Sequence, residues 1–303
     1  MHFDLPDLKL FVSVAEAGTL TKGARLACLS TSAASARLKS LEMQLGQPVF
    51  YRDNHGVTLT LAGEKLLRHA RIILRQVEHA KSDLSDDHDD AFGHIRIFAN
   101  TTAVTEFMPK VLGRFMAERP HVTVDLMERP VRDVVRGVAD GTVDLGIAAG
   151  CPTPPNLQGI HFSTDRMVLV APLGHALGER DAVGFHETLP YEHVGLHEGS
   201  SLSAFLHDVV SHQQQPLVVR IQLRSFEAMC SMISAGVGVG VLPESAAQRY
   251  SRTMPLQIYQ LTDLWAVRER QILVRDRAAL PACAQTLIAA VLAYFPSDPA
   301  AAR

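Results

Sequence analysis

Small hydroxyl and basic side chains are concentrated in one stretch of the sequence, residues 31 to 39. Hydroxyl groups can exchange hydrogen bonds with the edges of DNA bases, and arginine and lysine can pair with phosphate or with guanine. A solvated helix face would explain any one of these residues alone, but their combination favours contact with double-stranded DNA. The candidates for this contact are Thr31, Ser32, Ser35, Ala36, Arg37 and Lys39.

A second group of residues could hold a small molecule. In "ANTTAV", Asn100, Thr101 and Thr102 combine polar side chains with the free N–H groups of a predicted helix start, which is a good cradle for an anion. An ordinary helix N-cap is the alternative for the threonines. Arg129 and Phe226 are weaker candidates, because a loop arginine and a core aromatic residue would look the same. The full set is Asn100, Thr101, Thr102, Arg129, Glu198, Ser200, Ser201 and Phe226, and we expect the two serines to face Thr101 from a second lobe.

The DNA candidates lie on the third of three predicted helices. Apolar residues recur at helical spacing before Gly18, and a short second helix follows. Residues 30 to 32 cap the third helix, whose predicted inner face is Ala34, Leu38, Leu41 and Leu45. This layout of two short helices, a tight turn and a helix with an exposed polar face is that of a helix-turn-helix. It would place the start of the third helix, where the side chains are small, in the major groove.

The segment after these helices predicts a wing and a linker. "VFYRDNHGVTLT" indicates two strands joined by a turn, on which Arg52 and His55 would lie near the sugar-phosphate backbone. From Thr60 a long helix carries an apolar seam with a repeat near 3.5, which a helix from a second copy of the chain would cover. Five aspartates within residues 83–90 then predict a polar hinge.

Beyond the hinge, predicted strands alternate with helices. This pattern indicates a mostly parallel sheet with any ligand at the carboxyl ends of its strands. A second stretch of the same kind follows, and two α/β lobes joined by crossovers would enclose a small ligand. The fold class is therefore α/β multidomain, with a winged helix-turn-helix at 1–60, a linker helix and hinge at 61–90, and a two-lobed domain at 91–303. Lobe I would span about 91–163 and 268–303, and lobe II about 164–267.

Composition excludes several other classes of protein. A hydrophobic content of 47% with 20% charged residues is ordinary for a globular protein. The acidic start does not fit a secretory signal, and no apolar run approaches the roughly 18 residues of a membrane span, so we expect a cytoplasmic protein with no membrane partner. Four widely separated cysteines and the irregularly spaced His186, His193 and His197 predict no metal site, and we expect no cofactor.

One long segment of the chain resembles the signature of the LysR-type transcriptional regulators: "SAASARLKSLEMQLGQPVFYR". The matching positions are Ala33, Ser35, the "LE" and "LG" pairs, Phe50 and Arg52. "TLAGEKLL" resembles the start of that family's dimerising linker helix, and "VDLGI" its effector domain, so the likeness covers nearly the whole chain. It implies a sequence-specific DNA-binding regulator, not an enzyme. A small-molecule effector between the lobes of a domain similar to periplasmic binding proteins would modulate its DNA binding or promoter activation.

The same resemblance implies partners. One recognition helix would bind each half of an imperfect inverted repeat, the chain would form homodimers or homotetramers, and RNA polymerase would be a further partner. Thr31 and Ala36 stand where the family usually has glutamine and arginine, and Ser32 where it often has proline or serine, so the operator cannot be copied from a relative. Gly23 stands where the family has alanine, a change worth about 1 kcal/mol against helix formation. The hydroxyl-rich helix starts suggest a carboxylate-bearing metabolite as the effector.

Two other classes fit parts of the sequence. An enzyme would need a nucleophile or an acid–base group with an orienting partner, and we identify neither such a pair nor a P-loop. A solute-binding protein would share the two-lobed fold, but it would carry an export signal and lack the helix-turn-helix. The sequence therefore favours a regulator over both.

Overall fold

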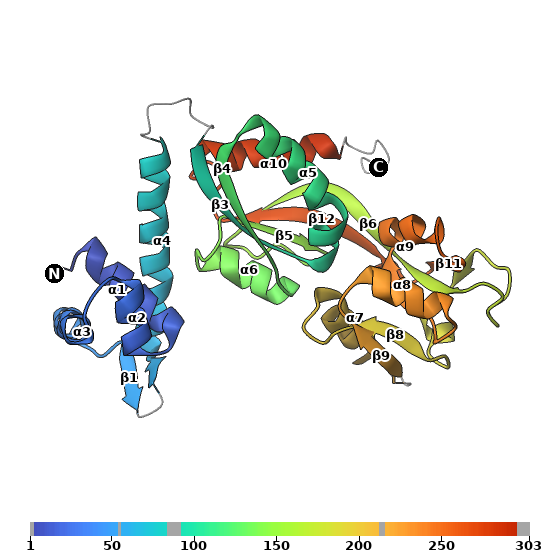
Figure 1. Cartoon of the computed structure of the whole chain (residues 1–303), viewed down its shortest axis with the longest axis horizontal. Coiled ribbons are helices and arrows are strands. Elements are labelled where there is room, and N and C mark those ends of the chain that lie inside the picture. Colours follow the sequence, from blue (N-terminus) through green and yellow to red (C-terminus); the bar gives the residue numbers. More distant parts are fainter. Residues whose placement is uncertain (1–2, 54–55, 84–91, 212–215, 296–303) are drawn as a thin grey trace. The chain divides into compact units, whose positions relative to one another are not determined.

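The structure of the chain, a computed structural model (Figure 1), describes residues 3–53, 56–83, 92–211 and 216–295. These residues form two compact units, of which the first holds the N-terminal helices and hairpin, and the second holds the α/β elements from residue 92 onward. The predicted DNA contact His55 and residues 84–90 of the predicted hinge lie outside the described residues.

The first unit begins with the three predicted helices, which are α1 (Leu5–Ala17), α2 (Leu20–Leu26) and α3 (Thr31–Leu45). Asp4 and Asp7 form a reciprocal capping box at the start of α1, and Gly18 ends that helix in a left-handed conformation with φ of 67°. Ser30 caps α3 by accepting a hydrogen bond from the Ala33 N–H at 3.2 Å. The three helices pack against one another. Their shared core contains Leu8, Phe11, Val14, Ala34, Leu38 and Leu41, which confirms most of the predicted inner face.

Gly23 has a packing role inside α2. A Cβ added at this position would collide with the backbone and side chain of Val14 on α1. The glycine thus lets the two helices approach more closely than an alanine would allow, and this contact offsets its poor helix propensity.

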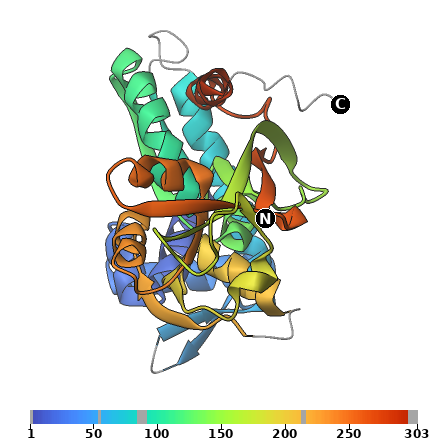
Figure 2. The same cartoon turned by 90° about the vertical axis from the view of Figure 1, so that its right-hand side faces the viewer.

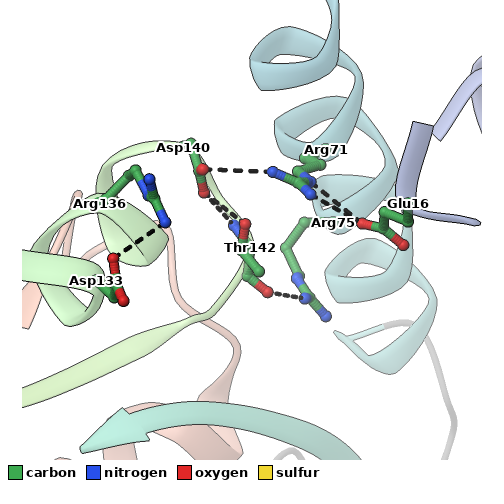
Figure 3. A network of polar contacts seen from close by, with 7 residues as sticks. All are labelled: Glu16, Arg71, Arg75, Asp133, Arg136, Asp140 and Thr142. Atoms are coloured by element: carbon green, nitrogen blue, oxygen red, sulfur yellow. Dashed lines mark hydrogen bonds and ion pairs between the residues drawn. The ribbon is translucent and has the colours of Figure 1, made fainter. Parts of the chain in front are cut away.

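The wing and the linker helix complete the first unit. Strands β1 (Phe50–Asp53) and β2 (Gly56–Leu59) pair antiparallel, as predicted. Helix α4 (Leu61–Asp83) follows, and its Arg71 donates from Nε and Nη2 to Glu16 on α1 at 3.3 and 3.0 Å (Figure 3). The predicted seam of α4 is divided, because part of it packs on the unit's own core while Ile73 is 41% exposed.

The second unit is built on a mixed sheet. Strands β4 (His121–Glu128), β3 (Phe92–Ala99) and β5 (Leu145–Ala149) run parallel in that order, as predicted. The long strands β12 (Val267–Val274) and β6 (Gln158–Pro172) follow, and β12 pairs antiparallel with both β5 and β6. The expectation of a mostly parallel sheet is therefore wrong beyond the first three strands. Strands β6 and β12 run antiparallel between the lobes, so a pair of strands joins the lobes in place of the predicted crossovers.

Helices cover both faces of the lobe I strands (Figure 1). Alternate residues point to opposite faces, so Ile97 and Ile147 contact one helical layer whereas Phe98 and Ala148 contact the other. The first layer contains α5 (Met108–Glu118) and α10 (Ala282–Tyr294), and the second contains α6 (Val131–Ala139). A short π-helix, Ala103–Phe107, leads into α5.

Lobe II is assembled on the far half of β6. Its strands β10 (Gly240–Pro243) and β11 (Leu256–Leu261) pair antiparallel with β6, while β7 (Ala182–Val183) extends β11 in parallel. Strands β8 (His193–Leu196) and β9 (Val219–Leu223) form a separate parallel pair. The helices are α7 (Ser201–Ser211), α8 (Phe226–Ser234) and α9 (Glu244–Ser251), and α8 packs beside α9 (Figures 1 and 2). Strands β7 and β11 and helix α9 were not predicted from the sequence.

Over the ranges that the structure describes, none of the helices combines the length and the apolarity needed to cross a membrane.

Candidate DNA interface and effector site

The exposed face of α3 carries most of the predicted DNA contacts. Thr31, Ser32, Ala36 and Lys39 are exposed, and Ser35 is half-buried. Thr31, Ser35 and Lys39 follow one another at a spacing of four residues, which aligns them along one side of the helix. The core residues occupy the other side, so the fold presents a row of small and basic side chains to the solvent.

The start of α3 is also suited to approach phosphate. The Ser30 hydroxyl caps the first turn and lies 3.1 Å from the Ser32 hydroxyl. The first N–H groups of a helix are otherwise unpaired and carry a partial positive charge, which favours an anion at this end. Together with the absence of bulk at Ala36, this allows the helix end to enter a groove.

Arg37 does not join the row. Its Nε donates to Asp7 at 2.7 Å and its Nη2 to Asp4 at 2.9 Å, both at the start of α1. The hydrogen bond to Asp7 raises the pKa of Arg37, while the hydrogen bond from the Asp7 backbone N–H, and then the charge of Arg37, lower the pKa of Asp4. Arg37 therefore links α3 to α1 in this structure, and a DNA phosphate would have to compete with two carboxylates for it.

Glu42 is a structural residue whose role the sequence analysis missed. Its Oε1 accepts hydrogen bonds from the N–H groups of Val49 and Phe50 at 3.0 and 3.3 Å, and its Oε2 accepts from Arg52 Nη2 at 3.2 Å. It thereby ties the first strand of the wing to α3. The "LE" pair in the signature was the signal that could have indicated it. Arg52 stays 41% exposed beside this contact.

A hollow of about 330 Å³ lies between α2, α3 and the wing. The hollow brings the hydroxyl groups of Thr19 and Thr21 next to Arg52. The predicted contact of Arg52 with the sugar-phosphate backbone of DNA would therefore lie in a recess. The lining residues are Thr19, Leu20, Thr21, Leu38, Phe50, Arg52, Asp53, Gly56 and Val57.

The second unit brings together residues that the sequence predicted to meet across two lobes. The Ser201 hydroxyl, at the start of α7, lies 3.2 Å from the Thr101 hydroxyl and 3.4 Å from the Thr101 backbone nitrogen. The Thr101 hydroxyl donates to Glu128 at the end of β4 at 2.6 Å. All these contacts lie at carboxyl ends of strands or at helix starts. Glu128 was not among the predicted residues.

The remaining effector candidates are divided between caps, surface and core. Asn100 Oδ1 accepts a hydrogen bond from the Ala103 N–H at 2.9 Å, and the fully buried Ser200 accepts one from the Ser203 N–H at 3.1 Å. Thr102 is buried and makes no side-chain capping bond. The other three do not join Thr101 and Ser201: Arg129 and Glu198 are exposed, and Phe226 is buried in the core of lobe II.

Arg129 lies against an aromatic ring. Its guanidinium carbon is 5.2 Å from the ring centroid of Phe98, and its Nη1 donates to the Glu128 carbonyl at 2.8 Å. These contacts fit the alternative explanation of Arg129, which is an arginine held at the surface of a loop and not a ligand contact.

Nothing in the sequence indicated that charged side chains are buried on β6 and β12, the strands between the lobes. Arg270 Nη2 donates to Asp165 at 2.6 Å, and Arg268 Nη2 donates to the Ala149 carbonyl at 2.6 Å. Burial raises the pKa of Asp165 and lowers that of Arg268. In the sequence these residues look like solvated charges on a strand, and only their pairing across β6 and β12 shows that they are buried together.

Within the part of the chain that the structure describes, no group of three or more histidine, cysteine or acidic residues could hold a metal ion.

A winged helix-turn-helix unit combined with a two-lobed α/β unit is the architecture of a ligand-responsive transcriptional regulator.

Comparison with known proteins agrees with this class. Residues 5–64 match the family described as bacterial regulatory helix-turn-helix protein, lysR family, and residues 88–296 match the LysR substrate binding domain. The chain belongs to the LysR family. It is a DNA-binding transcriptional regulator that responds to a small-molecule effector, and it is not an enzyme.

Individual relatives cover most of the chain. The HTH-type transcriptional regulator IlvY of Escherichia coli is 32% identical over 250 residues, which cover 80% of this chain and 82% of that one. A probable RuBisCO transcriptional regulator of Emiliania huxleyi is 26% identical over 284 residues, with coverage of 91% and 90%.

Among solved structures, a full-length OxyR variant from Pseudomonas aeruginosa superposes with a TM-score of 0.71 at 18% identity, covering 97% of this chain and 98% of that one. CbnR in complex with its target DNA gives a TM-score of 0.51 at 20% identity, with coverage of 95% and 98%. At these identities the likeness concerns the fold alone.

Proposed function

We propose that the chain regulates transcription by placing the first turn of α3 in the major groove of an imperfect inverted repeat, with one copy of the chain at each half-site. The observation that supports this most directly is the exposed row of Thr31, Ser35 and Lys39 beside the Ser30 cap. CbnR, which has a similar fold, has been solved with its target DNA. The proposed DNA-binding domain spans residues 1–60.

The proposed DNA contacts have different roles. Thr31, Ser32 and Ser35 contact base edges, and Ala36 provides the clearance that the helix needs. Lys39 and Arg52 pair with the phosphate backbone, as His55 would on the wing. Arg37 retains a contact with DNA only by exchanging its bonds to α1, so we assign it chiefly to positioning α3.

We propose a homodimer or homotetramer that contacts RNA polymerase at its promoters and acts in the cytoplasm. The linker helix and hinge span residues 61–90, and the exposed Leu61 and Ile73 on α4 offer apolar surface to a second copy. A relative from Salmonella typhimurium is named a transcriptional activator, which supports activation as the mode of control.

The proposed effector domain spans residues 91–303 and binds its ligand between the lobes at the Thr101–Ser201 contact. Lobe I comprises about 91–163 and 268–303, and lobe II about 164–267. We infer that the ligand is a small carboxylate-bearing metabolite, because hydroxyl groups from both lobes and a helix N–H group of lobe I meet there. Asn100, Thr102 and Ser200 shape this site, whereas Arg129, Glu198 and Phe226 are peripheral to it.

A gel shift and a footprint on the DNA upstream of the chain's own gene test the DNA-binding proposal. We expect protection of two half-sites whose centres are one helical turn of about 10 base pairs apart, or a multiple of it. Protein that binds this DNA no better than a random duplex of equal length contradicts the proposal.

Calorimetry tests the placement of the effector once a carboxylate panel has identified a ligand that changes the gel shift. Thr102→Val should weaken binding of that ligand, and the exposed Thr123→Val, on the outer strand β4, should not. Equal affinity in wild type and both variants contradicts the placement.

A further inference from the structure

Two arginines meet one carboxylate on the strands that connect the lobes. Arg270 donates to Asp165 at 2.6 Å, and Arg268 is the direct cross-strand neighbour of Asp165 on the β6–β12 ladder. The exposed fractions of Asp165, Arg268 and Arg270 are 3%, 7% and 8%. These three residues lie on the strands between the two lobes, far along the chain from the linker hinge, and are here named the hinge cluster. They carry an excess of positive charge in a buried place, where an uncompensated charge is strongly unfavourable.

Hydrogen bonding in the hinge cluster is incomplete. Among the described residues, Arg268 Nε and Asp165 Oδ2 have no hydrogen-bond partner, and the same is true of the Oγ atom of Ser163 on β6. Buried polar atoms are nearly always paired in folded proteins, so these unpaired ones are available to a water molecule or to the polar atoms of a ligand.

Arg268 lies where the two lobes touch. Its Nη2 donates to the Ala149 carbonyl at the end of β5 in lobe I, and its guanidinium carbon lies 4.2 Å from the ring centroid of Phe205 on α7 in lobe II. Phe205 is one helical turn after Ser201, which contacts Thr101. Arg268 and the Thr101–Ser201 contact therefore belong to the same surface between the lobes.

Gly150 packs directly against the unpaired nitrogen of Arg268. A Cβ added to Gly150 would lie 2.6 Å from Arg268 Nε, and the glycine is itself exposed, with φ of 66°. A side chain at this position would displace the guanidinium, so glycine is needed for Arg268 to take its place between the lobes.

Within the site between the lobes, the distribution of charge favours Arg268 over Thr101 as the partner of the ligand's carboxylate, and leaves the hydroxyl groups for the ligand's other polar atoms. The Thr101 hydroxyl already donates to Glu128, so a carboxylate bound at Thr101 would face another carboxylate. Positive charge is in excess around Arg268, and a guanidinium forms strong, directional hydrogen bonds with carboxylates.

We propose that the carboxylate of the effector binds Arg268 between the lobes and thereby balances the charge of the hinge cluster. This inference rests on the proposed effector site between the lobes and adds its charge partner. Because Arg268 also contacts Ala149 and Phe205, a bound carboxylate acts on groups of both lobes.

Thermal unfolding of the full-length protein tests the proposal, with acetate, malonate and succinate as probes. Sodium chloride keeps the ionic strength constant, and neutral malonamide is the uncharged reference. The melting temperature of the wild type should rise by about 2 to 4 °C once a carboxylate exceeds its Kd several-fold, and malonamide should leave it unchanged.

Three variants separate Arg268 from general charge effects. Arg268→Met should lose the shift, whereas Arg166→Met should keep it, because Arg166 is an exposed arginine on the same strand as Asp165. Asp165→Asn removes the negative charge of the hinge cluster, so it should lower the carboxylate concentration at half-maximal shift several-fold.

An equal shift in wild type and Arg268→Met overturns the proposal, as does a wild type that none of the three carboxylates stabilises. If Arg268→Met does not fold, an unchanged or weaker response in Asp165→Asn overturns it. A gel shift of the wild type without carboxylate reports separately on the proposed function. If the protein binds its DNA but gives one of these results, the proposed DNA-binding function stands and only the proposed Arg268 site is rejected.

Discussion

The hydroxyl oxygen of Thr101 lies 3.2 Å from that of Ser201, although the two residues are 100 positions apart in the chain. One belongs to the strand ends of lobe I and the other begins α7 of lobe II. Their contact joins the lobes at the surface where we place the effector, so a ligand that enters there must compete with it.

Ser201→Ala should weaken this contact between the lobes. A hydrogen bond of this kind is worth about 1 kcal/mol, so amide hydrogen exchange in residues 101–107 should become roughly fivefold faster without ligand. The half-buried Ser203→Ala on the same helix is the control and should leave the exchange unchanged. Equal exchange in wild type and Ser201→Ala would show that the contact does not hold the lobes together.

Lys39 and Arg52 should contribute to DNA binding through phosphate. Lys39→Ala and Arg52→Ala should each weaken binding on all sequences and reduce the slope of log affinity against log salt by about one unit. Lys110→Ala, an exposed lysine on α5, is the matched control and should keep the slope. Arg37→Met should leave the slope closer to wild type, because two carboxylates of the first unit hold Arg37 whereas a single one contacts Arg52. A salt titration in which both Ala variants keep the wild-type slope rejects the phosphate role.

Gly23→Ala should destabilise the first unit even though alanine favours helix by about 1 kcal/mol. The added Cβ would collide with Val14, and overpacking of this kind destabilises by about 1 to 3 kcal/mol. The opposing effects leave a lower melting temperature for the first unit. Ala24→Gly, at the neighbouring buried position, supplies the comparison, since it removes a methyl group without a collision. A variant Gly23→Ala that is more stable than wild type contradicts the packing explanation.

His193 should make the stability of lobe II depend on pH. Burial lowers its pKa from 6.5 to about 4, with the ring nitrogens near the Tyr191 carbonyl and the Thr188 hydroxyl. The unfolded chain therefore binds a proton first as the pH falls. The free energy of unfolding should decline from about pH 6.5 to about pH 4, by roughly 3 kcal/mol in all, and its His193 contribution should be constant above pH 6.5.

Denaturant unfolding of His193→Gln and wild type at pH 7 and pH 5 measures this effect. The wild type should lose about 2 kcal/mol more than the variant over this range. A parallel loss in both proteins shows that His193 is not the group responsible.

The sequence predicted those parts of the fold that depend on near neighbours. Helical spacing and caps indicated α1 and α3, and the Asn-His-Gly turn indicated the wing, because each pattern is complete within about a dozen residues. The Thr101–Ser201 contact was also expected, since helix starts at strand ends meet across a two-lobed fold.

Long-range pairing was harder to predict. Arg37 looked like an exposed base on a helix, and its partners, Asp4 and Asp7, lie about thirty residues earlier in the chain. Arg268 and Asp165 become neighbours only through the antiparallel pairing of β12 with β6, which the expectation of a mostly parallel sheet did not contain.

The base preference of Ser35→Ala tests the central claim, that the first turns of α3 lie in the major groove. Binding sites selected from a random duplex library should give an inverted repeat for the wild type. For Ser35→Ala, discrimination should fall by about 1 to 3 kcal/mol at one position of each half-site, with an unchanged salt slope. Selection of no repeat by the wild type, or an equal loss of affinity by the variant on every sequence, contradicts the claim.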